Sequence, residues 1–121
     1  MYWLKEILWF DDFSLEAEVI ITDGHYDLRC FTYPLELKKG DLLNFYIMIF
    51  NSKNVVRTYE KEYFVEKLHG PFDYNLTGEL INRKEGIVKI GEIYLEGLDK
   101  IPGDIIEGDF VSFECWRLDL N

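Results

Sequence analysis

The segment SLEAEVIITDGHYDLRCFTY, residues 14–33, constrains the fold of this chain most strongly. Asp23-Gly24 at its centre is a pair favoured in two-residue type I′ hairpin turns, because both central positions need positive φ. Such a turn pairs Ile21 with Tyr26 and Val19 with Leu28, and directly paired residues share a face of the sheet. We therefore expect a β-hairpin with one apolar face, formed by Leu15, Ala17, Val19, Ile21, Tyr26, Leu28 and Cys30.

Further strand patterns separated by turn residues occupy the rest of the chain. We expect strands at 42–50, 72–81 and 109–120, a turn at 51–54, and a polar loop at 82–86 that ends in glycine and contains a residue in left-handed conformation. Residues 55–68 have both helical and strand spacing, but the Gly-Pro turn that follows favours a strand over 63–68. About seven strands without a long helix predict an all-β fold, either a small barrel or a tight sandwich.

One phrase occurs twice in the chain. LKKGDLLNF (37–45) and IIEGDFVSF (105–113) each contain Gly-Asp, an apolar pair, a small polar residue and a Phe, and FSLEAEVI (13–20) lines up with YNLTGELI (74–81). These similarities predict two similar three-stranded halves, pseudo-repeats 13–50 and 74–118. Alternatively, two strands of one sheet use the same turn chemistry. A Gly-Asp strand that follows a hairpin also resembles a feature of OB-type barrels, although this resemblance covers only the short turns and implies no ligand.

Length and charge limit the class of protein. The 121 residues fit a single domain, 1–121, and 48% of them are hydrophobic, which supplies a core. The net charge is −10, from 23 acidic and 13 basic residues. A surface with this negative charge disfavours binding to nucleic acid and to anionic membranes, and it suits binding to a basic protein partner.

We expect a cytoplasmic protein without membrane association, because the sequence shows neither a transmembrane run nor a signal peptide and its two cysteines are far apart. No apolar run approaches the roughly 18 residues of a transmembrane helix. The N-terminus MYWLKEILWFDDF has no basic segment before its apolar residues and no cleavage site after them. Cys30 and Cys115 lie in separate apolar runs, so we expect two buried thiols, with no disulfide and no zinc site.

Catalytic and metal-binding motifs are absent from the sequence. His25 and His69 lie beside turns, and no Gly-x-Ser-x-Gly, His-Glu-x-x-His, EF-hand or phosphate-loop pattern occurs. We therefore expect no catalytic residue, no metal and no cofactor, and we expect that the protein is not an enzyme.

Binding residues are the remaining candidates. Two tryptophans near the N-terminus can form an exposed patch on an edge strand, or can cap the core. Acidic residues in the segments 60–66 and 104–109 can form a docking surface for a basic partner. The candidate partner-binding residues are Trp3, Trp9, Glu60, Glu62, Glu66, Asp104, Glu107 and Asp109.

An acidic protein-interaction domain is the function that this profile favours. Inhibitor and immunity-type proteins are analogous only in class, because no motif matches them. One alternative is an OB-like binder of single-stranded nucleic acid, which needs a basic groove from Lys38, Lys39, Arg57, Lys61, Arg83 and Lys84. The other alternative is a barrel that binds a small ligand, or an enzyme of unknown reaction. The oligomeric state stays open.

Overall fold

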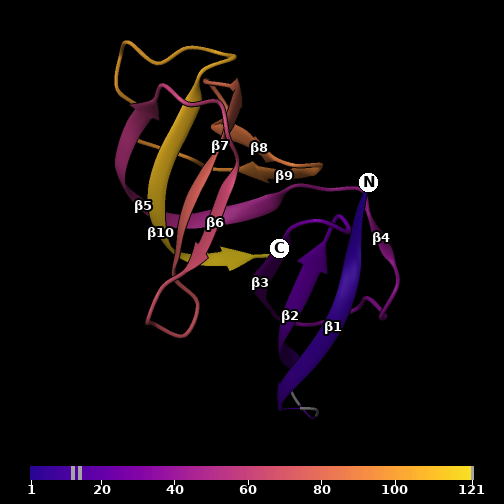
Figure 1. Cartoon of the computed structure of the whole chain (residues 1–121). Helices are drawn as coiled ribbons and strands as arrows, with labels where there is room; N and C mark the ends of the chain where they lie inside the picture. Colours follow the sequence, from indigo (N-terminus) through magenta and orange to yellow (C-terminus); the bar gives the residue numbers. More distant parts are fainter. Residues whose placement is uncertain (12, 14, 121) are drawn as a thin grey trace.

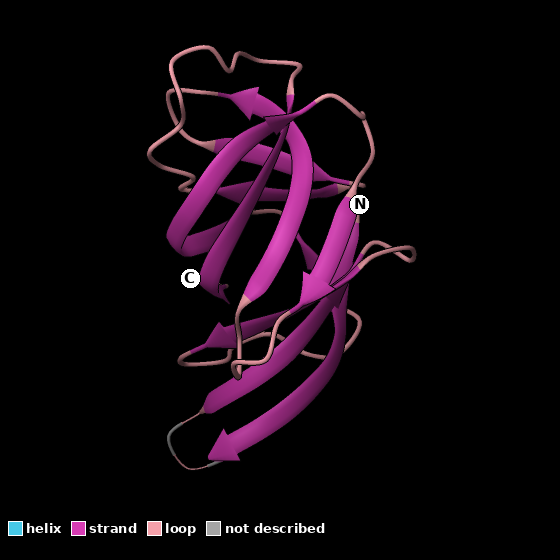
Figure 2. Cartoon of the chain, turned by 60° about the vertical axis from the view of Figure 1, so that its left-hand side comes forward, coloured by secondary structure: helices cyan, strands magenta, loops and turns pink. Residues whose placement is uncertain are grey.

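A computed structural model describes residues 1–11, 13 and 15–120, except the side chains of residues 9–11. The described residues form ten strands and no helix (Figures 1 and 2). The predicted all-β class is confirmed, with more strands than expected. The strands are β1 (Tyr2–Asp11), β2 (Glu16–Thr22), β3 (Asp27–Thr32), β4 (Leu42–Leu43), β5 (Ile47–Thr58), β6 (Phe64–Lys67), β7 (Tyr74–Asn82), β8 (Ile87–Ile90), β9 (Ile93–Glu96) and β10 (Phe110–Asp119).

Five of these strands close into a barrel. Strand β10 pairs antiparallel with both β5 and β7, so that Val111 lies between Arg57 and Gly78. Strands β7, β8 and β9 form an antiparallel meander, and β9 pairs in parallel with β5. Closure leaves these strands without long open edges. The predicted small barrel is therefore confirmed.

Four of the remaining strands form a sheet beside the barrel, and the fifth, β6, pairs with the barrel strand β7. Strands β4, β1, β2 and β3 lie side by side in that order, next to the barrel (Figures 1 and 2). The end of β10 joins this sheet, because Asp119 pairs in parallel with Phe31 and the N–H of Leu120 donates to the C=O of Phe31 at 3.0 Å. Among the described residues, strand β6 pairs with β7 alone.

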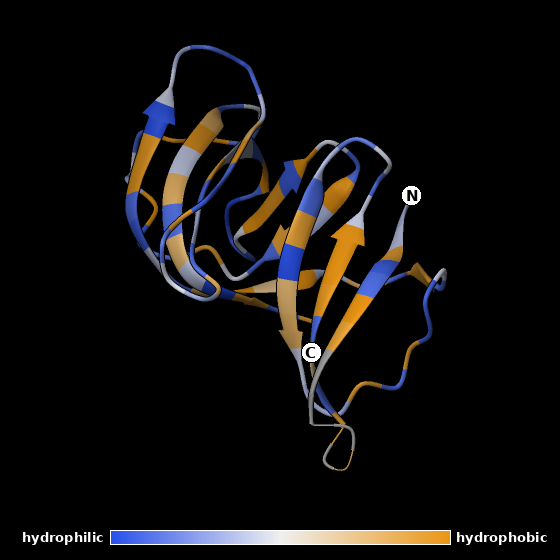
Figure 3. Ribbon diagram, turned by 60° about the horizontal axis from the view of Figure 1, so that its bottom comes forward, coloured by the Kyte–Doolittle hydropathy of each residue, from blue (hydrophilic) through white to orange (hydrophobic). Residues whose placement is uncertain are grey.

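The β2–β3 hairpin is present, but its turn was predicted wrongly. Its turn spans four residues, 23–26, so Ile21 pairs with Leu28 and Val19 pairs with Cys30. The cause is the Asp23 carboxylate, whose Oδ1 accepts the N–H groups of His25 at 2.8 Å and Tyr26 at 2.7 Å. A shift of two residues keeps Ala17, Val19, Ile21, Leu28 and Cys30 on their predicted buried face, because the period of a strand is two. Leu15 was predicted on this face wrongly, since it lies before β2 with φ of 61° and is exposed. Figure 3 shows the alternation of hydropathy along several strands.

Two further local predictions need correction. Residues 51–54 do not form a turn, because β5 runs through them and bulges opposite β10. Asn51 and Asn54 have φ of 54° and 55°, a left-handed conformation that Asn tolerates well. The predicted strand 42–50 is instead broken between β4 and β5. By contrast, the predicted strand within 63–68 and the predicted left-handed residue of the loop 82–86, which is Gly86, are both confirmed.

The two Gly-Asp phrases adopt the same turn. In each, the aspartate N–H donates to the C=O three residues earlier, at 3.0 Å for both Asp41 to Lys38 and Asp109 to Ile106. The aspartate Oδ2 accepts the N–H of that same earlier residue, at 2.8 Å and 3.0 Å respectively. The glycine before each aspartate has φ of 93°. The shared phrase therefore encodes a shared local structure.

Both turns also bind a strand in the same way. The turn glycine donates its N–H to Leu4 of β1 at 2.7 Å in one case and to Leu80 of β7 at 2.9 Å in the other. The same leucine donates its own N–H to the turn aspartate, at 3.0 Å and 2.9 Å. Strand β4 then pairs with β1, as β10 pairs with β7. These contacts make β1 the counterpart of β7, whereas the predicted repeats begin at residues 13 and 74. The duplication itself stays a prediction.

The core extends through the barrel and the N-terminal sheet. Its buried residues form one hydrophobic cluster that includes both cysteines, which are free thiols. Paired core positions on β1, β2 and β3 have counterparts on β7, β8 and β9, and all are fully buried: Leu4, Ile21 and Leu28 in the first set, Leu80, Val88 and Leu95 in the second.

Candidate functional site

Three of the predicted acidic residues stabilise the long loop before β10. The Arg57 guanidinium lies 3.5 Å from Asp104 Oδ2 and 3.8 Å from Asp109 Oδ2. Glu107 Oε2 accepts the backbone N–H of Arg83 at 3.0 Å, and this hydrogen bond holds the pKa of Glu107 below its usual value. These carboxylates are therefore engaged within the protein, although Asp104 and Glu107 remain exposed.

The other predicted glutamates lie along β6 and the loop before it. Glu60, Glu62 and Glu66 are exposed, and none forms an ion pair with a described residue. Glu66 Oε1 accepts a 3.4 Å hydrogen bond from Asn75. A cleft of about 220 Å³ is lined by Glu60 and Glu62 with Thr58, Tyr63, Phe64 and Thr77.

The predicted tryptophan patch does not join the acidic residues. Trp3 is half-buried in β1, and its ring lies against Gly24 at the tip of the β2–β3 hairpin. A Cβ added to Gly24 would lie 3.4 Å from the Trp3 ring. Trp9 pairs with Ala17 through its backbone, and its side chain lies outside the described residues. Trp3 therefore packs in the N-terminal sheet, while the acidic candidates border the barrel.

Three cations of the alternative basic groove have partners inside the protein. The Arg83 guanidinium donates to the C=O groups of Ile101 and Pro102 at 2.8 Å and of Ile105 at 2.6 Å. Arg57 is held by the aspartates described above, and Lys39 lies 3.3 Å from Glu6. These contacts do not favour a groove for a phosphate backbone.

A surface cluster that the sequence did not indicate lies where β3, β5 and β10 meet. We call it the aromatic patch: Phe31, Phe50, Phe72 and Trp116 around Arg117. Phe50 and Trp116 are 41% and 56% exposed, and their ring centroids are 5.5 Å apart. Strict alternation along a strand places Trp116 and Leu118 on the same face, yet Trp116 is exposed and Leu118 is fully buried. The difference arises because the end of β10 leaves β7 and joins β3.

Arg117 holds the aromatic patch together. Its guanidinium carbon lies 4.7 Å from the ring centroid of Phe31, 5.0 Å from that of Phe50 and 5.4 Å from that of Trp116. Asp119 accepts two hydrogen bonds from the guanidinium, at 2.7 Å and 3.1 Å. A bidentate pair of this kind fixes the side chain geometrically and balances its charge.

Trp116 lines two clefts. The first, of about 260 Å³, is lined by Asn51, Lys53, Leu68, Asp73, Glu114, Cys115 and Trp116. The second, of about 200 Å³, is lined by Gly70, Pro71, Phe72, Asp73, Trp116 and Arg117. An exposed indole that lines two hollows presents a surface that complementary side chains of a partner can fill.

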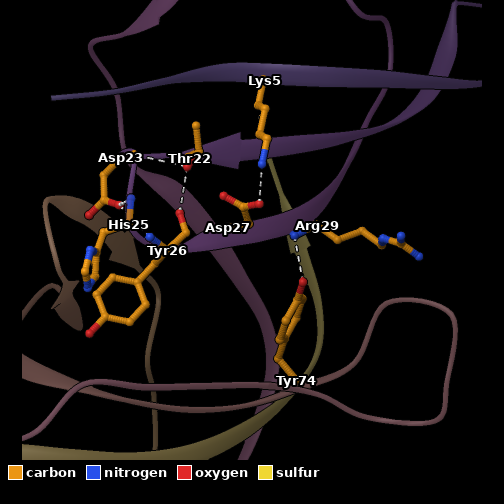
Figure 4. Close-up of polar contacts among 9 residues, drawn as sticks. Lys5, Thr22, Asp23, His25, Tyr26, Asp27, Arg29 and Tyr74 are labelled. Carbon is orange, nitrogen blue, oxygen red and sulfur yellow. Dashed lines mark hydrogen bonds and ion pairs between the residues drawn. The ribbon is translucent and has the colours of Figure 1, made fainter.

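The contact between the N-terminal sheet and the barrel positions Phe31 in this patch. The Tyr74 hydroxyl accepts the N–H of Arg29 at 2.8 Å, and Asp23 Oδ2 accepts the N–H of Glu92 at 2.8 Å (Figure 4 shows the Tyr74 contact). Burial raises the pKa of Tyr74 to about 12, so its hydroxyl stays protonated at pH values where an exposed tyrosine ionises. Both contacts tie the β2–β3 hairpin to the barrel.

The described residues hold no cluster of metal ligands, and both cysteines are buried in the core. No group of three His, Cys, Asp or Glu side chains among them is placed to hold a metal ion. Burial raises the pKa of Cys115 to about 12 and the pKa of Cys30 well above its usual value, so neither thiol is an activated nucleophile. Among the residues that the structure describes, none belongs to a helix with the length and hydropathy of a membrane span.

Comparison with protein-family models, with curated proteins and with solved structures finds no match to this chain. Inferences about function therefore depend on the surface and the chemistry described above.

Proposed function

We propose that this protein is a non-enzymatic docking domain that binds another protein through the aromatic patch. The observation that carries the proposal is the exposed pair Phe50 and Trp116, held beside Arg117. Trp and Arg are enriched among the few residues that supply most binding energy in protein interfaces, and such residues fill or border pockets. The two clefts beside Trp116 have this relation to it.

The order of the patch supports the same proposal. Arg117 is fixed by Asp119 and lies against three rings, so its rotamer is determined before any partner arrives. Side chains that are already ordered lose little conformational entropy on binding. A preorganised aromatic surface is therefore suited to recognition of a folded protein.

The partner that we propose is basic. The net charge of −10 attracts a positively charged protein and raises the rate of encounter, while the aromatic patch supplies the short-range contacts. We also place the protein in the cytoplasm, since its two free thiols fit a reducing compartment. The proposed function resembles that of inhibitor and immunity-type proteins in general class only, since no motif of this chain matches them.

The test is affinity capture from the cells that make the protein, followed by binding measurements with the purified partner. We expect Trp116→Ala to weaken binding by roughly 30-fold or more, as truncation of a central interface residue does. Tyr59→Ala is the matched control, because Tyr59 is 88% exposed and lies outside the patch. Equal loss in both variants, or none in Trp116→Ala with its fold intact, would contradict the proposal.

An OB-like binder of single-stranded nucleic acid is the second candidate function. A closed five-stranded barrel with exposed aromatic residues favours it, because bases stack on such rings. It predicts binding of an oligonucleotide that weakens steeply with salt and is lost in Trp116→Ala. Oligonucleotide binding of this kind would replace the protein-docking proposal, whereas its absence would remove the alternative.

A further inference from the structure

Strand β6 has an edge with no strand partner. It is the last strand of the sheet, and among the described residues it pairs with β7 alone. The N–H of Leu68 donates to the C=O of Asp73, and hydrogen-bonded pairs recur at every second residue of an antiparallel ladder. Phe64 and Glu66 therefore bond to β7, and the backbone N–H and C=O groups of Val65 and Lys67 point away from it.

The outer face of β6 carries an exposed ring beside a cleft. Phe64 is 46% exposed and lines the 220 Å³ cleft with Glu60, Glu62 and Tyr63. An added strand bonds through its backbone to such an edge, and its alternate side chains enter neighbouring pockets. This edge thus offers both backbone partners and a hollow for a side chain.

The charges beside this edge indicate the chemistry of its occupant. Glu60, Glu62 and Glu66 form no ion pair with a described residue, and Lys61 is the cation between the first two. Lys67 is already committed, since its Nζ lies 3.5 Å from Asp73 Oδ1 and donates to the C=O groups of Leu68 and Gly70. Three glutamates against one free lysine suit a positively charged strand.

A second copy of this chain is disfavoured as the occupant. Two β6 strands paired across their open edges would bring two sets of the same glutamates together, and like charges across paired strands are destabilising. A basic segment instead gains attraction from every glutamate of the set.

We infer that the open edge of β6 binds an extended, lysine- or arginine-rich segment of a partner protein, which adds to the sheet as a strand. This site is separate from the aromatic patch, so it goes beyond the proposed function. The partner's backbone bonds to Val65 and Lys67, and its basic side chains face Glu60, Glu62 and Glu66.

The first test is amide hydrogen exchange in the free protein. The amides of Val65 and Lys67 should exchange at least tenfold faster than those of Phe64 and Glu66, whose N–H groups bond to β7. Equal protection of all four amides would show that the edge is already covered and would overturn the inference.

The second test adds the blocked peptide acetyl-Lys-Val-Lys-Val-Lys-Val-amide and repeats the exchange measurement. We expect the amides of Val65 and Lys67 to slow by at least tenfold. The same peptide with alternate backbone nitrogens methylated should have no effect, because it cannot form the ladder. Failure to protect these amides at millimolar peptide, or equal protection by the methylated peptide, would overturn the inference.

Matched variants separate this site from the aromatic patch. Glu60→Gln/Glu62→Gln should weaken peptide binding about tenfold, whereas Glu36→Gln/Glu85→Gln, with the same change in net charge, should not. Val65→Pro removes an outward N–H at an edge position that tolerates proline and should abolish binding. Because Val65 also packs against the core, circular dichroism of this variant verifies that the fold is retained. Trp116→Ala should leave peptide binding unchanged, so each proposal can fail without the other.

Discussion

At the scale of residues, single carboxylates determine the geometry of several turns. Asp23 accepts three backbone N–H groups, two within its own hairpin turn and one from Glu92 in the β8–β9 turn. Asp41 and Asp109 each close a Gly-Asp turn. Aspartate is suited to this role because its short side chain reaches nearby backbone amides. The acidity of this chain is therefore partly structural.

Asp23→Asn tests this role. Although burial opposes ionisation, the hydrogen bonds from Tyr26, Glu92 and His25 hold the pKa of Asp23 below its usual value. Asparagine keeps one acceptor oxygen for the N–H groups of His25 and Tyr26, but its amide nitrogen cannot accept the N–H of Glu92. We therefore expect a loss of about 1–2 kcal/mol in the free energy of unfolding at pH 7. Denaturant unfolding measures it, with Glu85→Gln as a control.

The contribution of Asp23 to the free energy of unfolding should decrease as the pH falls. A carboxylate whose pKa is lowered in the folded state contributes stability above its unfolded pKa of about 4 and loses that contribution as the pH falls through its folded value. The difference between wild type and Asp23→Asn should therefore shrink below about pH 4. A constant difference from pH 7 to pH 2 would contradict an ionised role for Asp23.

The two thiols should be inert in the folded protein. Burial raises the pKa of both Cys30 and Cys115, and both side chains are within the core. We expect a thiol reagent at pH 8 to modify them only as fast as the protein unfolds, while both react at once in denaturant. Rapid modification of either thiol under native conditions would show that the core opens locally there.

At the scale of elements, one side chain organises the longest loop. Arg83, in the β7–β8 turn, donates to three C=O groups of residues 101–105, and its own backbone N–H binds Glu107. The loop therefore has a fixed shape although it contains no strand. Its Gly-Asp turn then directs β10 onto β7.

Arg83→Ala should release this loop. Loss of three hydrogen bonds from a charged donor is expected to lower the free energy of unfolding by roughly 2–4 kcal/mol and to speed hydrogen exchange over residues 99–108. Arg83→Lys should recover only part of the loss, since an ammonium lacks the planar fork. Lys84→Ala is the control, and unchanged exchange in Arg83→Ala would refute the role of the guanidinium.

At the scale of the whole molecule, the two halves of the chain exchange strands. Strand β5 follows β4 in sequence but closes the barrel with β9 and β10, and the end of β10 pairs with β3 of the N-terminal sheet. The core is one cluster across both parts. We therefore expect the chain to unfold as a single cooperative unit, which is what the predicted domain 1–121 requires.

Dissection of the chain tests this expectation. The barrel needs β5 from the first half and β7–β10 from the second, so fragments 1–60 and 61–121 should each be unfolded alone and should gain strand structure when mixed. Circular dichroism of the separate and mixed fragments measures this. Cooperative unfolding of either fragment alone would contradict the exchange of strands and would favour two independent domains.

The sequence by itself determined the all-β class, the buried faces of the hairpin and the geometry of the Gly-Asp turns. These features depend on interactions within a few residues, and alternation is insensitive to an error of two residues in turn length. Only the tertiary structure decided which strands became neighbours. Phe31, Phe50, Phe72 and Trp116 come from distant parts of the chain, and they form one surface because β10 bridges the barrel and the N-terminal sheet. Local periodicity carries no information about such long-range pairing, which depends on how the whole core packs.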